Sequence, residues 1–478
     1  MKHALKYADW CDSFNWDTCK LKNKEFGQFI SSYLRSSNKL VANLNSEWGS
    51  GKTNFLKRLY IDLAENNHPV IYIDAWESDY SKHPLSVVSA ELFQQLTSIL
   101  ASDDVHLGKV TDCFNRVLSF AKPIARLVSA SQPDSEYQQI SNVLEVVPDL
   151  PNGQISNALV SEGKTLVESV KDAHFEQVEA MRGLKNQLEL VASILGSVYE
   201  LKMPVVVLVD ELDRCRPNYA IEFLEVIKHF FEIDNFVFLC ASDTKQLCAS
   251  IKTIYGSEFD AETYLKRFFE RTITLPKPEI SEYIKSRGVK QSDNAKVTLH
   301  PSLDNEKLFI DIFSKTISLL SRGKAGGLSL RDVDQIIAKY EAIIFNLGQS
   351  GDSDVDVVVL ITMLTLNQVG SSDYTLSKFP LLAGELVSGH ELREVIKNQF
   401  LLAQEVIGSV RYRFGGRSTE YGQAQKMLAL EKKGPITAIN TEFQRSHEIL
   451  IKNYSENPAK YLLIEDYKKL VELSGAIL

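Results

Sequence analysis

The sequence contains few cysteines, and they follow no recognisable pairing pattern. Its 478 residues include six cysteines and nine histidines. They form no CxxC pair, no HExxH segment and no spacing typical of a zinc site. These absences argue against a disulfide framework and against a zinc enzyme. We therefore expect reduced thiols, with Cys240 and Cys248 as small core residues, because both lie in or beside apolar runs.

Long hydrophobic runs are also missing. The longest strongly apolar stretch, Val357–Leu366, is too short to cross a bilayer, which takes about 20 residues. No apolar segment follows the basic start Met1–Lys6, which argues against a signal peptide. We therefore expect a cytoplasmic protein without a membrane partner.

Charge gives no strong indication of a nucleic-acid partner. The net charge of −9 provides no global attraction for nucleic acid or for an anionic membrane. One segment, Arg411–Arg417, mixes cations and aromatics, which suits stacking on single-stranded nucleic acid. A solvated turn or a lid segment facing a nucleotide is the favoured interpretation, so nucleic acid is an open partner that nothing else indicates.

The first half of the chain alternates short apolar runs with helical periodicity. Strands are predicted at Leu40–Leu44, Val70–Ile73, Val205–Val209, Phe236–Ala241 and Thr272–Leu275. Amphipathic helices are predicted at Thr53–Glu65, Tyr219–Phe231 and Ala261–Arg271. Fully apolar strands are typical of sheets covered on both faces. The fold class is therefore α/β, with a doubly wound parallel sheet.

Three regions are expected along the chain. Residues 1–275 form the α/β core, with a helical insertion at about 84–200. Beyond Pro276 the β signal stops, and residues 276–345 are predicted to be helical. Turn-forming residues at Asn346–Asp356 predict a loop that begins an all-α C-terminal region, residues 346–478.

The segment Gly49–Thr53 carries the strongest functional motif. It reads Gly-Ser-Gly-Lys-Thr and stands between a predicted strand and a predicted helix, which is the setting of a P-loop. Backbone N–H groups of Gly49, Ser50 and Gly51 are expected to surround a phosphate at the helix N-terminus. Lys52 is expected to reach the β- and γ-phosphate oxygens, and the Thr53 hydroxyl to ligate Mg²⁺.

The motif departs from the usual P-loop at one position. The common pattern is Gly-x-x-x-x-Gly-Lys-Ser/Thr, and this chain has Ser46 in place of its first glycine, five residues before Gly51. Serine adopts an unusual φ only at a cost. We therefore expect Ser46 to keep an ordinary backbone conformation, with Gly49 supplying part of the flexibility.

A second motif, Asp210–Arg214, directly follows the apolar run Val205–Val209. A carboxylate at the carboxyl end of a buried strand is where such enzymes hold Mg²⁺, so Asp210 is assigned to the metal. Glu211 is placed to polarise the attacking water as a general base. The alternative, a solvated helix start, fits poorly with clustered charges directly after an apolar strand. For Asp213 and Arg214, an intramolecular ion pair and a catalytic role are equally open.

Four stretches together resemble the KAP P-loop NTPases, a branch of the ASCE group of ATPases, over roughly residues 15–345. They are Glu47–Thr53 with its Trp48, Ile73–Glu77, Val209–Pro217 and Tyr264–Phe269. The resemblance implies a P-loop NTPase with ATP and Mg²⁺, and places Trp48 among the nucleotide-binding residues. It makes 276–345 a helical lid, Asp243 a polar sensor and Arg331 the arginine of the lid. For Asp74 and Trp76, packing at a strand end is favoured over chemistry.

The resemblance also bears on the long interval between the two motifs. Many members carry a pair of transmembrane helices there, but residues 84–200 contain no apolar run of spanning length. The chain therefore resembles a soluble bacterial member without the transmembrane insertion. Family habit points to bacterial antiviral (phage) defence.

The function expected from these residues is that of an ATPase, a nucleoside-triphosphate phosphohydrolase. Its turnover would drive or time a conformational change in an assembly. The alternative is a nucleotide-dependent switch or scaffold with little hydrolysis that recruits a separate effector protein. Glu211 favours the ATPase, because a pure binder has no need of a general base. A separate effector is expected in both cases, because the C-terminal third contains no other catalytic constellation.

A homo-oligomer is expected from two arginines. Arg267 and Arg271 are four residues apart, and so would share one face of the helix predicted from Ala261. In related ring-forming ATPases, arginines in this region complete a neighbour's site. An ion pair to Glu262 or Glu270 is the alternative.

Overall fold

The structure is a computed structural model that describes residues 5–80, 84–100, 182–289, 296–300, 306–321, 327–370 and 462–475, with single exceptions at 184, 187, 231, 232 and 463. It divides into two compact units that separate between Pro276 and Lys277, apart from two short loop segments. The units are described one at a time. Most of the insertion predicted at 84–200, and the segment Arg411–Arg417, lie outside the described residues.

The first unit is built on a parallel sheet of five strands in the order β2-β3-β4-β1-β5. The strands are β1 (Lys39–Asn45), β2 (Val70–Asp74), β3 (Val205–Asp210), β4 (Phe236–Ser242) and β5 (Arg271–Thr274). Every residue of β3 and β4 is buried, as expected for apolar strands with both faces covered. The predicted doubly wound parallel sheet is confirmed.

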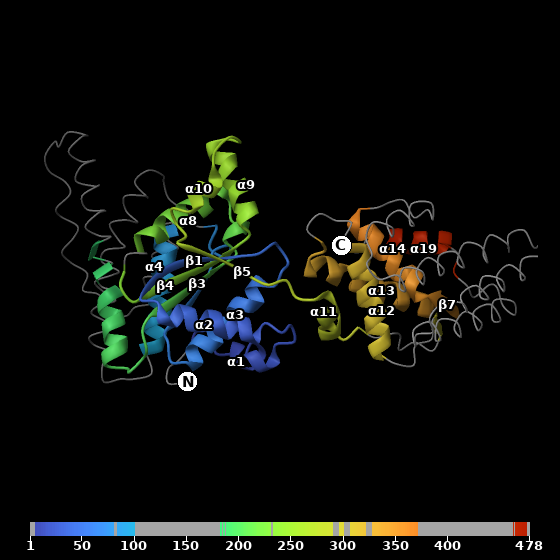
Figure 1. Cartoon of the computed structure of the whole chain (residues 1–478), viewed down its shortest axis with the longest axis horizontal. Coiled ribbons are helices and arrows are strands. Elements are labelled where there is room, and N and C mark those ends of the chain that lie inside the picture. Colours follow the sequence, from blue (N-terminus) through green and yellow to red (C-terminus); the bar gives the residue numbers. More distant parts are fainter. Residues whose placement is uncertain are drawn as a thin grey trace, which may run out of the picture. The chain divides into compact units, whose positions relative to one another are not determined.

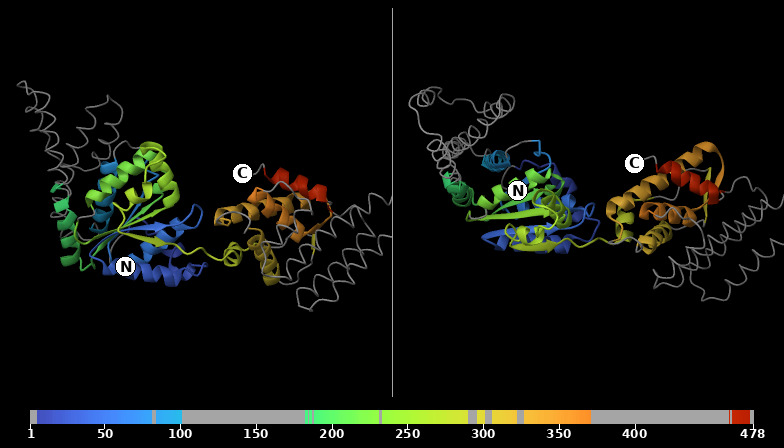
Figure 2. Two further views of the ribbon diagram at one scale, coloured as in Figure 1. Left: turned by 45° about the horizontal axis from the view of Figure 1, so that its top comes forward. Right: turned by 90° about the horizontal axis from the view of Figure 1, so that it is seen from above.

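Helices cover both faces of this sheet (Figures 1 and 2). One face carries α1 (Trp10–Ser13), η1 (Trp16–Thr18), α2 (Lys24–Ser36) and α3 (Lys52–Glu65), and the other carries α4 (Pro84–Leu100) and α8 (Pro217–Phe230). Successive strand residues point to opposite faces. Val206 and Leu208 therefore pack in the core under α3, whereas Val207 packs in the core under α4 and α8.

The first face contains a contact that admits only glycine. A Cβ added at Gly27 of α2 would lie 2.0 Å from the buried Trp16 ring. Gly27→Ala is therefore expected to destabilise the protein by about 1–3 kcal/mol, the usual cost of overpacking a core. Thermal unfolding measures the effect. The matched control is Ser31→Ala in the same helix, which removes a buried hydroxyl that has no hydrogen-bond partner and is expected to be neutral. Equal melting temperatures for Gly27→Ala and the wild type would contradict the packing.

The second unit has its own hydrophobic core. Its elements are α11 (Ile280–Arg287), β6 (Val297–His300), α12 (Glu306–Ser321), α13 (Leu330–Ser350), β7 (Ser353–Asp356), α14 (Val357–Val369) and α19 (Ile464–Ser474). The long apolar run Val357–Leu366 is buried on all sides within α14, which explains its composition. Asp356 caps this helix by accepting hydrogen bonds from the backbone N–H groups of Val358 and Val359.

Two sequence predictions for this unit are wrong. The β signal does not end at Pro276, because β6 and β7 pair in a two-stranded parallel sheet. The loop predicted at Asn346–Asp356 is also absent, since α13 continues to Ser350 and β7 follows. The strands were missed because four residues are too few for a periodicity to register. The end of α13 was missed because Leu347 and Gly348 are buried and continue the helix through residues that favour turns. A separate domain for residues 346–478 stays a prediction, because 371–461 lie outside the described residues.

Among the described helices, none is both long enough and apolar enough to cross a bilayer.

Candidate nucleotide-binding site

The P-loop connects β1 to α3 at the carboxyl edge of the sheet. Gly49 and Gly51 adopt φ values of 75° and 94°, which favour glycine, whereas Ser46 is not among the positive-φ residues. The expectation for Ser46 is thus confirmed. The fourteen-residue helix α3 begins at Lys52, so its first N–H groups and its positive dipole end lie at the loop. A backbone of this form suits a phosphate group.

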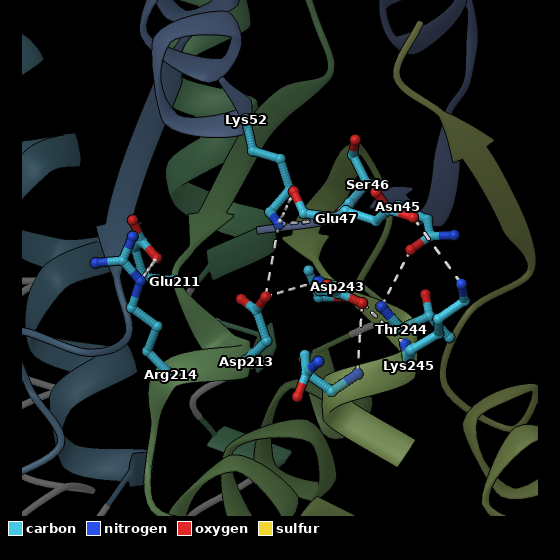
Figure 3. A network of polar contacts seen from close by, with 12 residues as sticks. Asn45, Ser46, Glu47, Lys52, Glu211, Asp213, Arg214, Asp243, Thr244 and Lys245 are labelled. Atoms are coloured by element: carbon cyan, nitrogen blue, oxygen red, sulfur yellow. Dashed lines mark hydrogen bonds and ion pairs between the residues drawn. The ribbon is translucent and has the colours of Figure 1, made fainter. Parts of the chain in front are cut away.

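Lys52 is held in place by the protein itself. Its side chain is almost fully buried, and its Nζ donates a hydrogen bond of 2.7 Å to the Ser46 carbonyl oxygen. The same Nζ lies 3.5 Å from Asp213 Oδ2. Asp213 Oδ2 also accepts a 2.8 Å hydrogen bond from the Asp243 backbone N–H. Figure 3 shows this chain of contacts, which places Asp213 inside the site, in an ion pair with Lys52.

Asp210 ends β3 and is completely buried. Its Oδ2 accepts a 2.8 Å hydrogen bond from the Tyr72 hydroxyl, and its Oδ1 accepts one of 2.9 Å from the Glu211 N–H. Burial raises the pKa of the Asp210 carboxyl, against the opposing effects of hydrogen bonds from Thr53 and Tyr72. A buried carboxylate beside a hydroxyl offers the hard oxygen donors that Mg²⁺ prefers. The residues present therefore fit that ion.

Tyr72 was not identified from the sequence. It lies within the apolar strand β2, and its hydroxyl reaches across to Asp210 on the neighbouring strand β3. A tyrosine in a buried strand usually needs a partner for its hydroxyl, which is the signal that could have found it.

Among the described residues, no group of three or more His, Cys, Asp or Glu side chains could hold a metal ion. A P-loop Mg²⁺ requires no such cluster, because water and phosphate supply most of its ligands. Asp74 is in register with Asp210 on the adjacent strand. Its Oδ1 accepts hydrogen bonds of 3.0 Å from the backbone N–H groups of Trp76 and Glu77. These bonds form the turn after β2, which agrees with the favoured interpretation of packing at a strand end.

Glu211 has an unusual backbone. Its φ of 58° and ψ of 23° are left-handed, a conformation that is uncommon for a residue with a side chain and is often found at functional sites. Oε1 accepts a 3.1 Å hydrogen bond from the Thr53 hydroxyl, and Oε2 lies 2.5 Å from Arg214 Nε. Burial and the nearby Asp210 charge raise the pKa of Glu211, whereas Arg214 lowers it. The question left open for Arg214 is answered by an ion pair.

Asp243 has a structural role in addition to its place beside Asp213. It is the N-cap of α9 (Thr244–Tyr255), and its Oδ1 accepts hydrogen bonds from the Lys245 and Gln246 backbone N–H groups. Next to it, Asn45 Oδ1 accepts a hydrogen bond from the Thr244 N–H. These bonds fix the loop after β4 against the end of β1. A role for Asp243 in sensing nucleotide stays a prediction.

The prediction that Arg267 and Arg271 share a helix face is wrong. Helix α10 (Ala261–Leu265) ends before both arginines, and Arg271 opens the strand β5. The helix stops because Phe268 and Phe269 turn into the core. The Glu270 N–H then donates a hydrogen bond to the Val41 carbonyl oxygen of β1. Both arginines are exposed. Arg267 lies over the Tyr264 ring, with its Cζ 5.9 Å from the ring centroid.

The structure also describes the two remaining predicted nucleotide-binding residues, Trp48 and Arg331. Trp48 is 43% exposed. Arg331 is the second residue of α13, whose first turn is fixed by a capping box between Ser329 and Asp332. Roles for Trp48 and Arg331 in binding nucleotide stay predictions.

A parallel α/β sheet with a P-loop after one strand and an Asp-Glu pair at the end of another, its aspartate buried, defines a P-loop NTPase domain. The model of the KAP family P-loop domain matches residues 24–298, which is more than half of the chain. The chain belongs to the KAP family of P-loop NTPases. Such a domain implies nucleotide binding.

Individual proteins give weaker similarities. The chain is 23% identical over 251 residues to the phage T7 exclusion protein of Escherichia coli (strain K12), a match that covers 52% of this chain and 31% of that protein. The chain thus corresponds to less than a third of the length of that relative. Among solved structures, C. elegans PCH-2 matches with a TM-score of 0.28 and 13% identity, over 77% of this chain and 73% of that one. A likeness at that level carries no argument about function or assembly.

Proposed function

We propose that the protein is a Mg²⁺-dependent ATPase whose turnover drives or times a conformational change in an assembly. The observation that carries the proposal is the arrangement of Lys52, Thr53, Asp210 and Glu211 at one edge of the sheet. The Thr53 hydroxyl, which is assigned to the metal, donates a hydrogen bond to Glu211, which is assigned to the attacking water. The two functions are therefore next to each other. Nucleotide binding alone would not call for Glu211 at this position.

Each residue would have a distinct task. Lys52 would neutralise charge on the β- and γ-phosphate oxygens, and Thr53 and Asp210 would hold the metal side of the nucleotide, Asp210 through water. Glu211 would orient the attacking water and accept its proton. Bound Mg²⁺ would itself neutralise charge that develops on the phosphate oxygens. Tyr72 would fix the Asp210 carboxylate through its 2.8 Å hydrogen bond.

The biological setting that we propose is antiviral defence in bacteria. The similarity to the phage T7 exclusion protein supports it. The activity that acts on the phage is proposed to belong to a separate effector protein, because the sequence of the C-terminal third contains no other recognisable catalytic constellation. A cytoplasmic location follows as part of the same proposal.

A second candidate is a nucleotide-dependent switch with little hydrolysis. It is supported by the ion pairs of Lys52 with Asp213 and of Glu211 with Arg214, which engage both reactive groups. Steady-state release of phosphate from Mg²⁺–ATP separates the two candidates. Turnover that depends on Lys52 supports the ATPase, whereas tight binding of ATP without phosphate release supports the switch.

We also propose a homo-oligomer in which an exposed arginine completes a neighbour's site. Arg271 is the stronger candidate, because it lies on β5, paired directly with the P-loop strand β1. Arg271→Ala is expected to lower turnover about 10³-fold or more, the usual effect of removing an arginine finger. Because the two arginines do not share a helix face, Arg267→Ala is tested separately as the matched control.

Mixing measures whether such an arginine acts between subunits. Arg271→Ala and Lys52→Ala are each expected to be inactive alone, and their mixture to regain activity by pairing an intact P-loop with an intact arginine. No recovery in a mixture shown to co-assemble would contradict the shared site. A strictly monomeric protein in the presence of ATP would also do so.

A further inference from the structure

The proposed chemistry uses the Thr53 hydroxyl and the two carboxylate oxygens of Glu211, and all three already contact another group of the protein. The Thr53 hydroxyl donates to Glu211 Oε1, at 3.1 Å. Glu211 Oε2 is paired with Arg214 at 2.5 Å. Both carboxylate oxygens of Glu211 therefore have a protein partner. A general base must present an oxygen to its water, and these two partners compete with the water for the oxygens of Glu211 and fix the orientation of its carboxylate.

The two contacts on Glu211 differ in strength. A hydroxyl that gives a lone pair to a metal ion keeps its hydrogen, so Thr53 can continue to donate to Oε1. Arg214 places a cation on Oε2, and a cation opposes proton uptake by a carboxylate. The ion pair with Arg214 is therefore the stronger restraint on Glu211.

Two further contacts hold Arg214 in place. Its backbone N–H donates to the Glu211 carbonyl oxygen at 3.1 Å, which closes the short helix η2 (Leu212–Arg214). Its guanidinium lies over the Trp76 ring, with Cζ 5.7 Å from the ring centroid, a distance at which a cation is attracted to an indole. Figure 3 shows the Glu211–Arg214 pair beside, and separate from, the Lys52–Asp213 pair.

The loop that carries Trp76 is itself attached to the segment after Asp210. Arg216 Nε donates to Asp79 Oδ1 at 3.1 Å, and the Tyr219 hydroxyl donates to Ser78 Oγ at 3.2 Å. The indole is 53% exposed, so it is a platform for Arg214 and is not a core residue. Its truncation is expected to leave the fold intact.

We propose that Arg214 is a positioning residue that restrains Glu211 and keeps basal hydrolysis slow. The inference rests on the proposed ATPase and adds a control element to it: turnover depends on how often Glu211 leaves Arg214. Trp76 strengthens the restraint because its ring holds the Arg214 guanidinium in place. Arg214 contacts neither phosphate nor metal in this scheme, and acts only through Glu211.

The test is steady-state hydrolysis of Mg²⁺–ATP by Arg214→Ala. The pair is partly exposed, and ion pairs of that kind are weak. We therefore expect kcat to rise about three- to tenfold, with KM nearly unchanged. Arg214→Lys keeps the cation but loses the planar guanidinium, and its kcat is expected to lie between those of the wild type and Arg214→Ala. Trp76→Ala is expected to raise kcat in the same direction but by less.

Two controls separate a restraint from a general loosening of the loop. Arg216→Ala removes an arginine two positions away that pairs with Asp79 instead; because it loosens only the loop that carries Trp76, it is expected to raise kcat no more than Trp76→Ala does. Glu211→Gln/Arg214→Ala is expected to be as slow as Glu211→Gln alone, since Arg214 acts through Glu211. Melting temperature and affinity for a non-hydrolysable ATP analogue show that each variant is folded and binds.

The outcomes separate this inference from the proposed function. If the wild type hydrolyses ATP and Arg214→Ala is no faster, the restraint is overturned and the ATPase stands. An equal acceleration in Arg216→Ala, or one that persists with Gln at position 211, also overturns it. A wild type that binds ATP without hydrolysing it, beside an active Arg214→Ala, upholds the restraint and corrects the basal activity. No hydrolysis by either protein overturns both.

Discussion

Lys52→Ala is expected to lower ATP turnover by about 10²-fold or more, together with a loss of nucleotide affinity. Lys52 is the only side-chain cation that the P-loop itself supplies, and a charge-assisted contact to developing phosphate charge contributes several kcal/mol. The measurements are phosphate release and direct titration with Mg²⁺–ATP. Normal turnover in this variant would remove the assignment of the phosphate site.

The same substitution has a structural consequence that needs its own control. Asp213 is fully buried and 3.5 Å from Lys52 Nζ, and a buried carboxylate that loses its cation is costly. The melting temperature is therefore expected to fall as well, and ADP binding to folded protein must be measured before activity is interpreted. Lys245→Ala is the matched control, because Lys245 is 85% exposed and pairs only loosely with Glu47, at 4.0 Å. It is expected to keep full activity.

Glu211→Gln is expected to keep nucleotide and Mg²⁺ bound while slowing hydrolysis by at least about 10²-fold, the usual contribution of a general base. The amide keeps the size of the side chain but has a single oxygen, which can accept from Thr53 or from Arg214, so one of the two contacts on Glu211 is lost. It loses the capacity to take a proton from water. Single-turnover hydrolysis, measured beside equilibrium binding, separates the two effects.

The control for this variant is the same chemical change at an exposed carboxylate. Glu222 lies on the solvent side of α8, so Glu222→Gln is expected to behave like the wild type. A Glu211→Gln variant with a normal rate would make Glu211 structural. Asp213 would then be the next candidate, although its Oδ2 already contacts Lys52 and the Asp243 N–H.

Much of the α/β core could be predicted from local patterns. The run Val205–Val209 is apolar throughout and becomes β3, buried on both faces. The P-loop residues and Asp210 were found because their chemistry depends on short spacings along the chain. The predicted helix at Thr53–Glu65 differs from α3 by one residue at its start. In each case the information lies within a few consecutive residues.

The parts that could not be predicted depend on contacts between distant residues. The Tyr72 hydroxyl meets Asp210 across 138 positions, and only the pairing of β2 with β3 brings them together. Helix α10 stops at Leu265 because Phe268 and Phe269 enter the core, which local helix propensity does not reveal. The left-handed conformation of Glu211 is likewise imposed by its neighbours and carries no mark in the sequence.

The core around α4 has a consequence for how this family can vary. Leu92 and Leu96 of α4 belong to the same hydrophobic cluster as Leu188 and Leu195, on the far side of residues 101–181. The points where that long segment leaves and re-enters the sheet domain are thus both anchored in the core. Lengthening a loop between fixed ends costs little free energy, because its closure entropy grows only slowly with length. Insertions of different kinds are therefore expected to be tolerated between these two anchored ends without changes to the nucleotide-binding site.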